Sequence, residues 1–345
     1  MIAFLANDFS NSGDHTAATS NIISCRAYFA AHIEIEVVIK LLITGARGML
    51  GSSIARLAAS KPEIELVLWD RSTVDLTDTE RVRELLGAVS PDAIIHAAAK
   101  VGGIHANIAH PVEFLAQNQV MDSNVLMGAL SNSVQNFVYV GSSCMYPRDY
   151  RQPLVESDIM AGPLEPTNEG YALAKISGSR LASYISREHG LSYRTIVPSN
   201  LYGPGDNFDS RSSHLVAACI AKVHDAKKAN KDAIDVWGDG LARREFTYVD
   251  DLSDWIIKAL PEMSRWPDLM NLGLGRDYSV NEFYAAAMEA VDYRVELEHD
   301  LSKPTGMHQK LMDSSLAIQT CGWAPSTDIQ VGMKTTYLNF LERGL

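Results

Sequence analysis

The feature that most constrains this chain is a repeated alternation of short apolar runs with longer helical patterns. The first run, 37–44, is rich in Val, Ile and Leu and ends at Gly45. Continuous runs of this kind are typical of parallel strands buried on both faces. Predicted strands are 37–44, 65–69, 93–97, 137–140 and 193–198, and predicted helices are 49–60, 79–89, 112–130 and 171–189. This order predicts an α/β fold with a Rossmann-type, doubly wound parallel sheet.

The two ends of the chain differ from this central pattern. Residues 1–36 are rich in Asn, Ser, Thr and Asp between 7 and 21, which predicts a flexible N-terminal extension outside the fold. Residues 37–200 carry the alternation and are the predicted dinucleotide-binding domain. In 201–345 the pattern loosens, Gly, Pro and Asn cluster at 201–213, and a short strand is predicted at 235–237. We expect mainly a smaller substrate-binding lobe here, with some strands returning to the main sheet, above the carboxyl ends where open α/β sheets bind ligands.

Charge and cysteine usage exclude several classes of protein. The net charge of −12 over 345 residues argues against nucleic acid as a partner, because phosphate backbones select basic surfaces. No uncharged apolar stretch reaches the roughly 18 residues that a membrane-spanning helix needs. The four cysteines form no CxxC pair and no metal-like cluster with histidine. We therefore expect a cytoplasmic protein from a reducing compartment, with no membrane partner and no bound metal.

A glycine-rich loop joins the first predicted strand to the first predicted helix. Gly45, Gly48 and Gly51 stand at intervals of three, where a backbone must turn sharply, approach a diphosphate closely and let a helix meet a sheet. The helix N-terminus would supply N–H donors and partial positive charge to the anion. A plain tight turn is the alternative. The context favours cofactor binding by the whole loop: Gly45, Ala46, Arg47, Gly48, Met49, Leu50 and Gly51.

The end of the second predicted strand carries mixed signals about which dinucleotide is bound. Asp70 lies 25 residues after Gly45, where a carboxylate usually holds the ribose hydroxyls of NAD. Arg47 and Arg71 are the kind of neighbours that accommodate the 2′-phosphate of NADP. These residues leave the choice open, and Arg47 can also be a solvated loop charge.

Tyr171 and Lys175 begin a predicted helix, and their spacing of four places them on one face. An ammonium beside a phenol favours the phenolate and is expected to lower the pKa of Tyr171, which makes it an acid or base near neutrality. Ser142 ends the fourth predicted strand, where its hydroxyl could bind a substrate carbonyl. An ordinary helix with a core tyrosine and a surface lysine is the alternative for the pair alone. Together with the glycine loop, the three residues predict a reductase site.

These residues resemble the extended short-chain dehydrogenase/reductase superfamily. More narrowly, the chain from about residue 40 to the C-terminus is similar to the GDP-L-fucose synthase family of nucleotide-sugar epimerase-reductases. The motifs that carry this resemblance are HAAAKVGG at 96–103, GSSCMYP at 141–147, LEPTNE at 164–169, NLYGP at 200–204 and REF at 244–246.

The resemblance implies 3,5-epimerisation and 4-reduction of GDP-4-keto-6-deoxy-D-mannose to GDP-L-fucose, with NADPH as the cofactor. Hydrogens at C3 and C5 are acidic because the enolate is delocalised onto the C4 oxygen, and inverting these centres needs a base and an acid on opposite faces. Cys144 matches the family's base and His214 its acid. Without the resemblance, Cys144 reads as a small buried residue and His214 as a structural histidine. Ser142 and Tyr171 would serve both reactions by binding the same oxygen.

The resemblance also implies binding residues and an assembly. Lys222, Trp237 and Arg244 match positions for the substrate diphosphate and guanosine, although Lys222 stands where related enzymes often carry Arg and lacks its bidentate fork. Trp237 can instead be core packing. We expect a homodimer and a GDP-sugar as the small-molecule partner. Further positions implied for the cofactor are Ala97, Ala98, Ala99, Tyr171, Lys175, Pro198, Asn200, Leu201 and His214.

Three other functions are alternatives to this one. A related enzyme could act on a different GDP-4-keto sugar, such as a precursor of colitose or a heptose, because Cys144 and His214 would serve any such epimerisation. A 4,6-dehydratase is disfavoured, since Ser143-Cys144-Met145 stands where dehydratases of the superfamily carry an acidic pair. A non-catalytic NAD(P)-binding sensor would have no use for the combination of Ser142, Tyr171 and Lys175.

Overall fold

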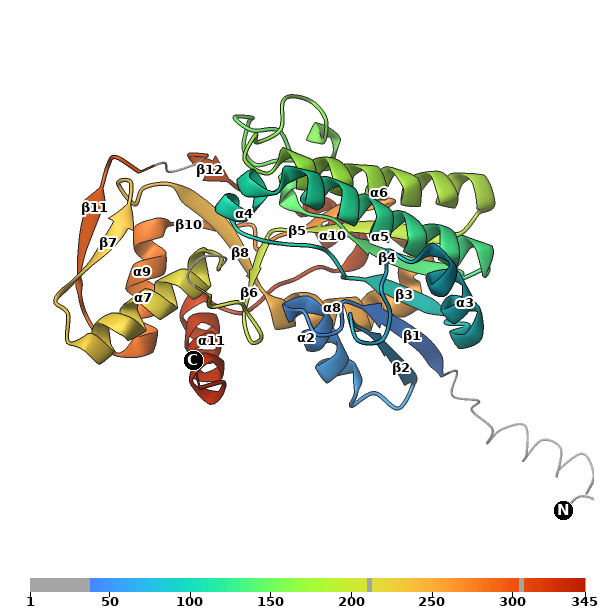
Figure 1. Ribbon diagram of the computed structural model, residues 1–345, viewed down its shortest axis with the longest axis horizontal. Helices are drawn as coiled ribbons and strands as arrows, with labels where there is room; N and C mark the ends of the chain where they lie inside the picture. Colours follow the sequence, from blue (N-terminus) through green and yellow to red (C-terminus); the bar gives the residue numbers. More distant parts are fainter. Residues whose placement is uncertain (1–37, 210–212, 304–306, 345) are drawn as a thin grey trace, which may run out of the picture. The chain divides into compact units, whose positions relative to one another are not determined.

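The computed structural model of the chain describes residues 38–209, 213–303 and 307–344. The predicted extension 1–36 lies outside the described residues. The main sheet has six strands, β1 (Ile39–Thr44), β2 (Ile64–Trp69), β3 (Ala93–His96), β4 (Asn136–Val140), β5 (Ser192–Pro198) and β9 (Leu269–Leu272). They lie in the order β2-β1-β3-β4-β5-β9, and every neighbouring pair is parallel (Figure 1). The strand order reverses between β1 and β3, and such a reversal creates a crevice for ligands at the carboxyl ends of the strands.

Helices cover both faces of this sheet because successive strand residues point to opposite sides. Leu41 and Ile43 of β1 are buried with one set of helices, and Leu42 is buried with the other. The first set is α2 (Met49–Ala58), α8 (Val249–Ala259) and α10 (Ser315–Cys321). The second set is α3 (Thr79–Val89), α5 (Pro111–Ser131) and α6 (Glu169–His189), with α5 and α6 packed side by side (Figure 1). A doubly wound sheet with a buried layer on each face results.

Short elements connect these layers on the side of the carboxyl ends. They are the helix α4 (Ile104–Ala109) and the 3₁₀ turns η1 (Ser143–Met145) and η2 (Glu156–Asp158), whereas the turn η3 (Leu260–Arg265) leads from α8 into the start of β9. Local sequence sets several helix ends: the Asp78 side chain caps α3 by accepting from the Arg81 N–H, and Gly190 ends α6 at a φ of 69°.

A second group of elements surrounds its own core. Its helices are α7 (Leu215–Ala229), α9 (Val280–Val291) and α11 (Ile329–Glu342), and its strands are β6 (Asn200–Tyr202), β7 (Ala233–Trp237), β8 (Arg243–Tyr248), β10 (Asp277–Ser279), β11 (Glu296–Asp300) and β12 (Gln309–Lys310). Its buried side chains include Tyr202, Cys219, Phe246, Phe283 and Phe340. Strands β6, β10 and β12 pair with β8, and β7 pairs with β11.

The predicted fold class is confirmed. The predicted helix 79–89 coincides with α3, and the other predicted elements up to residue 198 begin or end within two residues of the observed ones. Strand β9, which returns to the main sheet from the C-terminal part, has four residues and no clear pattern of its own. The boundary drawn at residue 200 between two domains stays a prediction.

Candidate active site

The glycine loop is too tightly packed to accept side chains. Gly45 has a φ of 71°, and a Cβ atom there would lie 2.7 Å from the backbone of Ala98; a Cβ on Gly51 would lie 2.3 Å from the Gly45 carbonyl oxygen. Helix α2 then begins after Gly48 with no side-chain cap and no acidic residue in its first turn. Its first N–H groups are therefore open to an anion. These features fit the diphosphate of a dinucleotide.

Asp70, at the end of β2, is already engaged by neighbouring side chains. Its Oδ2 lies 2.5 Å from Arg47 Nε, while Oδ1 accepts from the Ser72 hydroxyl at 2.6 Å and the Ser72 N–H at 2.7 Å. These contacts, the Ser72 hydroxyl foremost, lower the pKa of Asp70 to about 2. Arg71 is exposed beside them. The carboxylate is thus partly neutralised and shares both oxygens with the protein.

Ser142, Tyr171 and Lys175 come from the segments where β4 ends and α6 begins. Ser142 follows β4 as the N-cap of η1, and Tyr171 and Lys175 lie one turn apart in the first half of α6. The Ser142 hydroxyl is close enough to hydrogen-bond Tyr171. Lys175 is 2% exposed, and its Nζ lies 3.7 Å from Oδ1 of Asp122, a residue that the sequence patterns did not single out.

The expectation that the pKa of Tyr171 is lowered is wrong. Burial of the hydroxyl raises this pKa, the charges of Cys144 and Asp122 raise it further, and the Ser142 hydrogen bond opposes them. The Lys175 charge does not reverse this balance, because Asp122 pairs with it. Tyr171 is therefore protonated at neutral pH and poised to act as an acid.

Cys144 lies in the same group, within η1. Its backbone N–H donates to the Ser142 hydroxyl oxygen at 3.2 Å, and the Asn168 side-chain amide donates to its Sγ at 3.1 Å. The Oδ1 atom of Asn168 is buried without a partner among the described residues. An N–H group directed at sulfur can stabilise the charge of a thiolate base. The LEPTNE motif contains Asn168, but its spacing gave no reason to assign the residue a role.

Two cations lie side by side near Cys144, and the sequence analysis identified one of them. Arg244 of β8 is paired in register with Lys310 of β12. Burial lowers the pKa of Arg244 and that of Lys310, and the nearby charge of Glu165 raises both. The charge of Cys144 also raises the pKa of Lys310. Lys310 is an isolated lysine in a Gly- and Pro-containing stretch, so nothing in the sequence pattern marks it.

The remaining predicted substrate residues lie around α7 and β7. His214 is the exposed N-cap of α7, and desolvation lowers the pKa of its imidazole. Lys222 is held by Asp235, whose Oδ2 is 3.1 Å from its Nζ. Trp237 is 46% exposed, which excludes the core-packing alternative, and its ring meets His105 edge-on with Lys303 over it. No described contact joins His214 to Cys144.

The other cofactor positions follow the ends of central strands. Ala97, Ala98 and Ala99 come directly after β3, Pro198 ends β5, and Asn200 and Leu201 begin β6. The structure therefore brings most of the predicted cofactor positions to the carboxyl edge of the sheet, beside the glycine loop.

The described ranges contain no disulfide and no cluster of metal ligands. Cys144, Cys219 and Cys321 are free thiols there, and no group of three potential metal ligands occurs. None of the helices in this part of the chain is long and apolar enough to cross a membrane.

Comparison with known proteins identifies relatives over nearly the whole described chain. The NAD dependent epimerase/dehydratase family profile matches residues 41–273. A GDP-L-fucose synthase from Azorhizobium caulinodans is 42% identical over 88% of this chain and 96% of its own length. A GDP-L-colitose synthase from Yersinia pseudotuberculosis is also 42% identical, over 88% of this chain and 98% of its own.

A solved structure extends the comparison to a third sugar. The GDP-D-glycero-L-gluco-heptose synthase from Campylobacter jejuni, crystallised in the presence of NADPH, is 27% identical to this chain. The two folds superpose with a TM-score of 0.81 over 88% of this chain and 99% of the other.

Proposed function

The chain belongs to the NAD dependent epimerase/dehydratase family, and we propose that it is an NADPH-dependent enzyme that converts GDP-4-keto-6-deoxy-D-mannose to GDP-L-fucose. The observation that carries this proposal is the convergence of Ser142, Cys144 and Tyr171 on one point at the carboxyl edge of the sheet. Two of these groups can bind a ketone oxygen, and the third can remove a proton from a carbon beside it.

Epimerisation uses the acidity of carbons next to the C4 ketone. Cys144 is the proposed base, with the Asn168 amide 3.1 Å from its sulfur, and His214 is the proposed acid on the other face. The enolate charge falls on the C4 oxygen, where Ser142 and Tyr171 donate hydrogen bonds. No described contact ties His214 to this group, so its role rests on the family resemblance.

Reduction uses the same oxygen after inversion. The bound cofactor supplies hydride to C4, and the chain supplies the proton. Tyr171 is protonated at neutral pH because burial raises its pKa, so it can donate that proton to the C4 oxygen. One held ketone thus links both reactions.

The cofactor is the phosphorylated form, NADPH. The glycine loop would hold its diphosphate, and Arg47 and Arg71 would hold the 2′-phosphate, since Asp70 shares its charge with Arg47. Lys175 would contact the nicotinamide ribose.

The substrate's GDP group is proposed to bind in the lobe formed mainly by 201–345. Arg244 and Lys310 offer two adjacent, largely desolvated cations for the diphosphate. Trp237 offers an exposed ring for the guanine base. It lies on the same face of β7 as Asp235, which binds Lys222. Lys222 is proposed only as a secondary phosphate contact, because its ammonium group forms an ion pair with Asp235.

Assembly and location complete the proposal. Helices α5 and α6 expose the apolar side chains Val112, Val120, Met127, Leu173 and Tyr184. A homodimer that pairs these two helices with their copies would cover them, and light scattering should then give twice the mass of the chain. Cysteines without a CxxC pair support a reducing, cytoplasmic location.

Turnover of three purified sugars tests the assignment. GDP-4-keto-6-deoxymannose, its 3-deoxy counterpart and a GDP-4-keto-heptose would each be incubated with NADPH, and the products identified by NMR. We expect GDP-L-fucose from the first at the highest kcat/KM. A higher kcat/KM for the dideoxy sugar or the heptose would favour the activities named for the Yersinia or Campylobacter relatives. Binding of NADPH without turnover of any sugar would favour a sensor.

A further inference from the structure

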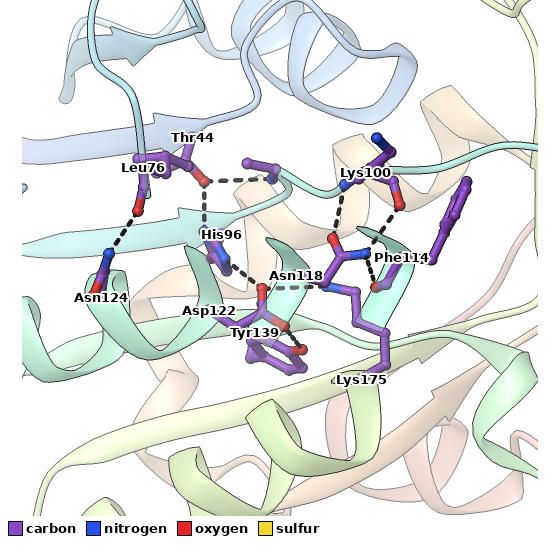
Figure 2. A network of polar contacts seen from close by, with 11 residues as sticks. Thr44, Leu76, His96, Lys100, Phe114, Asn118, Asp122, Asn124, Tyr139 and Lys175 are labelled. Carbon is purple, nitrogen blue, oxygen red and sulfur yellow. Dashed lines mark hydrogen bonds and ion pairs between the residues drawn. The ribbon is translucent and has the colours of Figure 1, made fainter. Parts of the chain in front are cut away.

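Asp122 is a buried carboxylate behind the catalytic group. It lies in the middle of α5 and is 1% exposed. Its Oδ1 accepts from His96 Nε2 at 2.9 Å, and its Oδ2 accepts from the Tyr139 hydroxyl. Lys175 Nζ completes the set, 3.7 Å from Oδ1 (Figure 2). Three elements, β3, β4 and α6, thus direct polar groups to one carboxylate on α5.

The network continues from Asp122 to the glycine loop. Burial lowers the pKa of His96, so its ring is neutral and carries one N–H. With Nε2–H donating to Asp122, Nδ1 accepts from the Thr44 hydroxyl at 2.7 Å. Thr44 directly precedes Gly45, and its Oγ1 accepts from the Ala98 N–H at 3.4 Å (Figure 2). The carboxylate is therefore fixed in place through the same backbone segments that form the predicted cofactor site.

The charges in this network balance. Burial pushes the pKa of Asp122 upward, but Lys175 and the His96 and Tyr139 hydrogen bonds outweigh it, so Asp122 is ionised. Burial lowers the pKa of Lys175, and Asp122 opposes that loss. The other titratable groups near the ammonium are neutral: His96, Tyr139, whose ring lies 4.6 Å from Nζ, and Tyr171. Asp122 is the anion paired with Lys175 among the described residues.

We propose that Asp122 is a positioning residue for the reaction, which keeps Lys175 protonated and directed at Tyr171 and the cofactor ribose. This inference rests on the proposed function, because Lys175 needs its charge for catalysis there. The rival reading is that Asp122 only satisfies His96 and Tyr139 within the core. The two readings differ in what happens to the charge of Lys175 when the carboxylate is removed.

The first test measures the ionisation of Lys175 without any substrate. Protein labelled with ¹³C at lysine Cε would be titrated by NMR, with the Lys175 signal assigned through Lys175→Met. In the unaltered protein we expect Lys175 to be protonated at about pH 8; a neutral Lys175 at that pH would overturn the proposal without any variant. In Asp122→Asn we expect its titration midpoint to fall by about 1–3 on the pH scale, the usual effect of losing an adjacent opposite charge.

Matched variants separate charge from packing. Asp122→Glu keeps the charge and should keep the midpoint near that of the unaltered protein. Asp158→Asn removes another buried carboxylate, which pairs with Arg151 at 2.7 Å, and should leave Lys175 unmoved. An unchanged Lys175 midpoint in Asp122→Asn would assign Asp122 a purely structural role.

The second test is the pH profile of turnover. In Asp122→Asn, turnover should begin to fall at a lower pH than in the unaltered enzyme. Above the new midpoint, the turnover rate should fall about tenfold for each pH unit, and it should return when the protein is acidified. An equal loss at every pH would contradict the proposal. If the unaltered chain turns over no GDP-4-keto sugar, the proposed function falls, while the NMR titration still decides the role of Asp122.

Discussion

At the residue scale, Tyr171 is the proposed proton donor for reduction. Its hydroxyl is hydrogen-bonded by Ser142 and is desolvated enough that burial raises its pKa. A protonated phenol next to the ketone can give up its proton only as negative charge develops on the C4 oxygen. The residue is therefore suited to act as an acid in the transition state and not as a resting phenolate.

Tyr171→Phe should abolish reduction while leaving cofactor binding nearly intact. Loss of a positioned acid typically slows a reaction by about 10²–10⁴-fold. NADPH oxidation in the presence of the keto sugar measures the first effect, and NADPH fluorescence titration measures the second. Turnover at the normal rate would remove Tyr171 from the mechanism.

Substitution of Cys144 or Asn168 should slow epimerisation more than it slows hydride transfer. We expect Cys144→Ser and Asn168→Ala to slow exchange of the C3 and C5 hydrogens about tenfold or more, because one loses the base and the other the N–H that supports its charge. Proton exchange is followed by NMR and hydride transfer by NADPH absorbance. Cys321→Ser, at a partly exposed thiol outside the site, is the control. Equal losses in both steps would count against a separate base.

Several site residues could not be found from the sequence because the fold assembles them from distant segments. Ser142, Tyr171 and Lys175 could be predicted, since they follow local spacing after recognisable elements. Asp122, Asn168 and Lys310 are single polar residues without a pattern. Their neighbours come from β3, η1 and β8, and only the tertiary structure brings these together.

At the scale of elements, we propose that two turns determine the choice of cofactor. The turn after β1 carries Arg47 and the turn after β2 carries Asp70 and Arg71, and the parallel pairing of the two strands places both turns at one edge. Arg47 forms an ion pair with Asp70, and the side chains of Arg47 and Arg71 are both exposed.

Arg47→Ala together with Arg71→Ala should weaken NADPH more than NADH. Charged hydrogen bonds contribute about 1.5–3 kcal/mol each, so we expect the KM for NADPH to rise at least about tenfold while that for NADH changes little. Initial rates with each cofactor measure the difference. Arg81→Ala, at an exposed arginine of α3, controls for the loss of surface charge. Parallel changes for both cofactors would show that the arginines do not read the 2′-phosphate.

Helices and strands could be predicted where the spacing of apolar residues and the length of the segment both indicated the same kind of element, as in β1, α3 and α6. They were less predictable in the C-terminal part, where β12 has two residues and β9 four. Such strands are held by pairing with β8 and β5 and not by their own apolar pattern. Tertiary contacts therefore decide this part of the fold.

At the scale of the whole molecule, buried acids outside the catalytic group shape stability. Asp206 is 3% exposed, its Oδ2 has no partner among the described residues, and burial raises its pKa to about 7. Its unfolded value is about 4, so the folded state binds this proton more tightly. The contribution of Asp206 to stability is therefore fully present below about pH 4 and is lost as the pH rises to about 7.

Asp206→Asn should remove this pH dependence. At about pH 8 we expect the variant to be more stable than the unaltered protein, by on the order of 4 kcal/mol, and the difference should shrink as the pH falls toward 5. Thermal midpoints across this range measure it. Glu245, whose pKa burial also raises to about 7, is present in both proteins and cancels in the comparison. A difference that does not vary with pH would contradict the assigned ionisation.

In the proposed mechanism, one ketone held in a single site undergoes both epimerisation and reduction. The most direct test is the mass and NMR spectrum of the product formed from GDP-4-keto-6-deoxymannose and NADPH in deuterated water. We expect GDP-L-fucose that carries solvent deuterium at both C3 and C5, because each inversion exchanges the carbon-bound hydrogen before C4 is reduced. A reduced product without solvent label would contradict this mechanism and leave a simple 4-reductase, with Cys144 and His214 wrongly assigned.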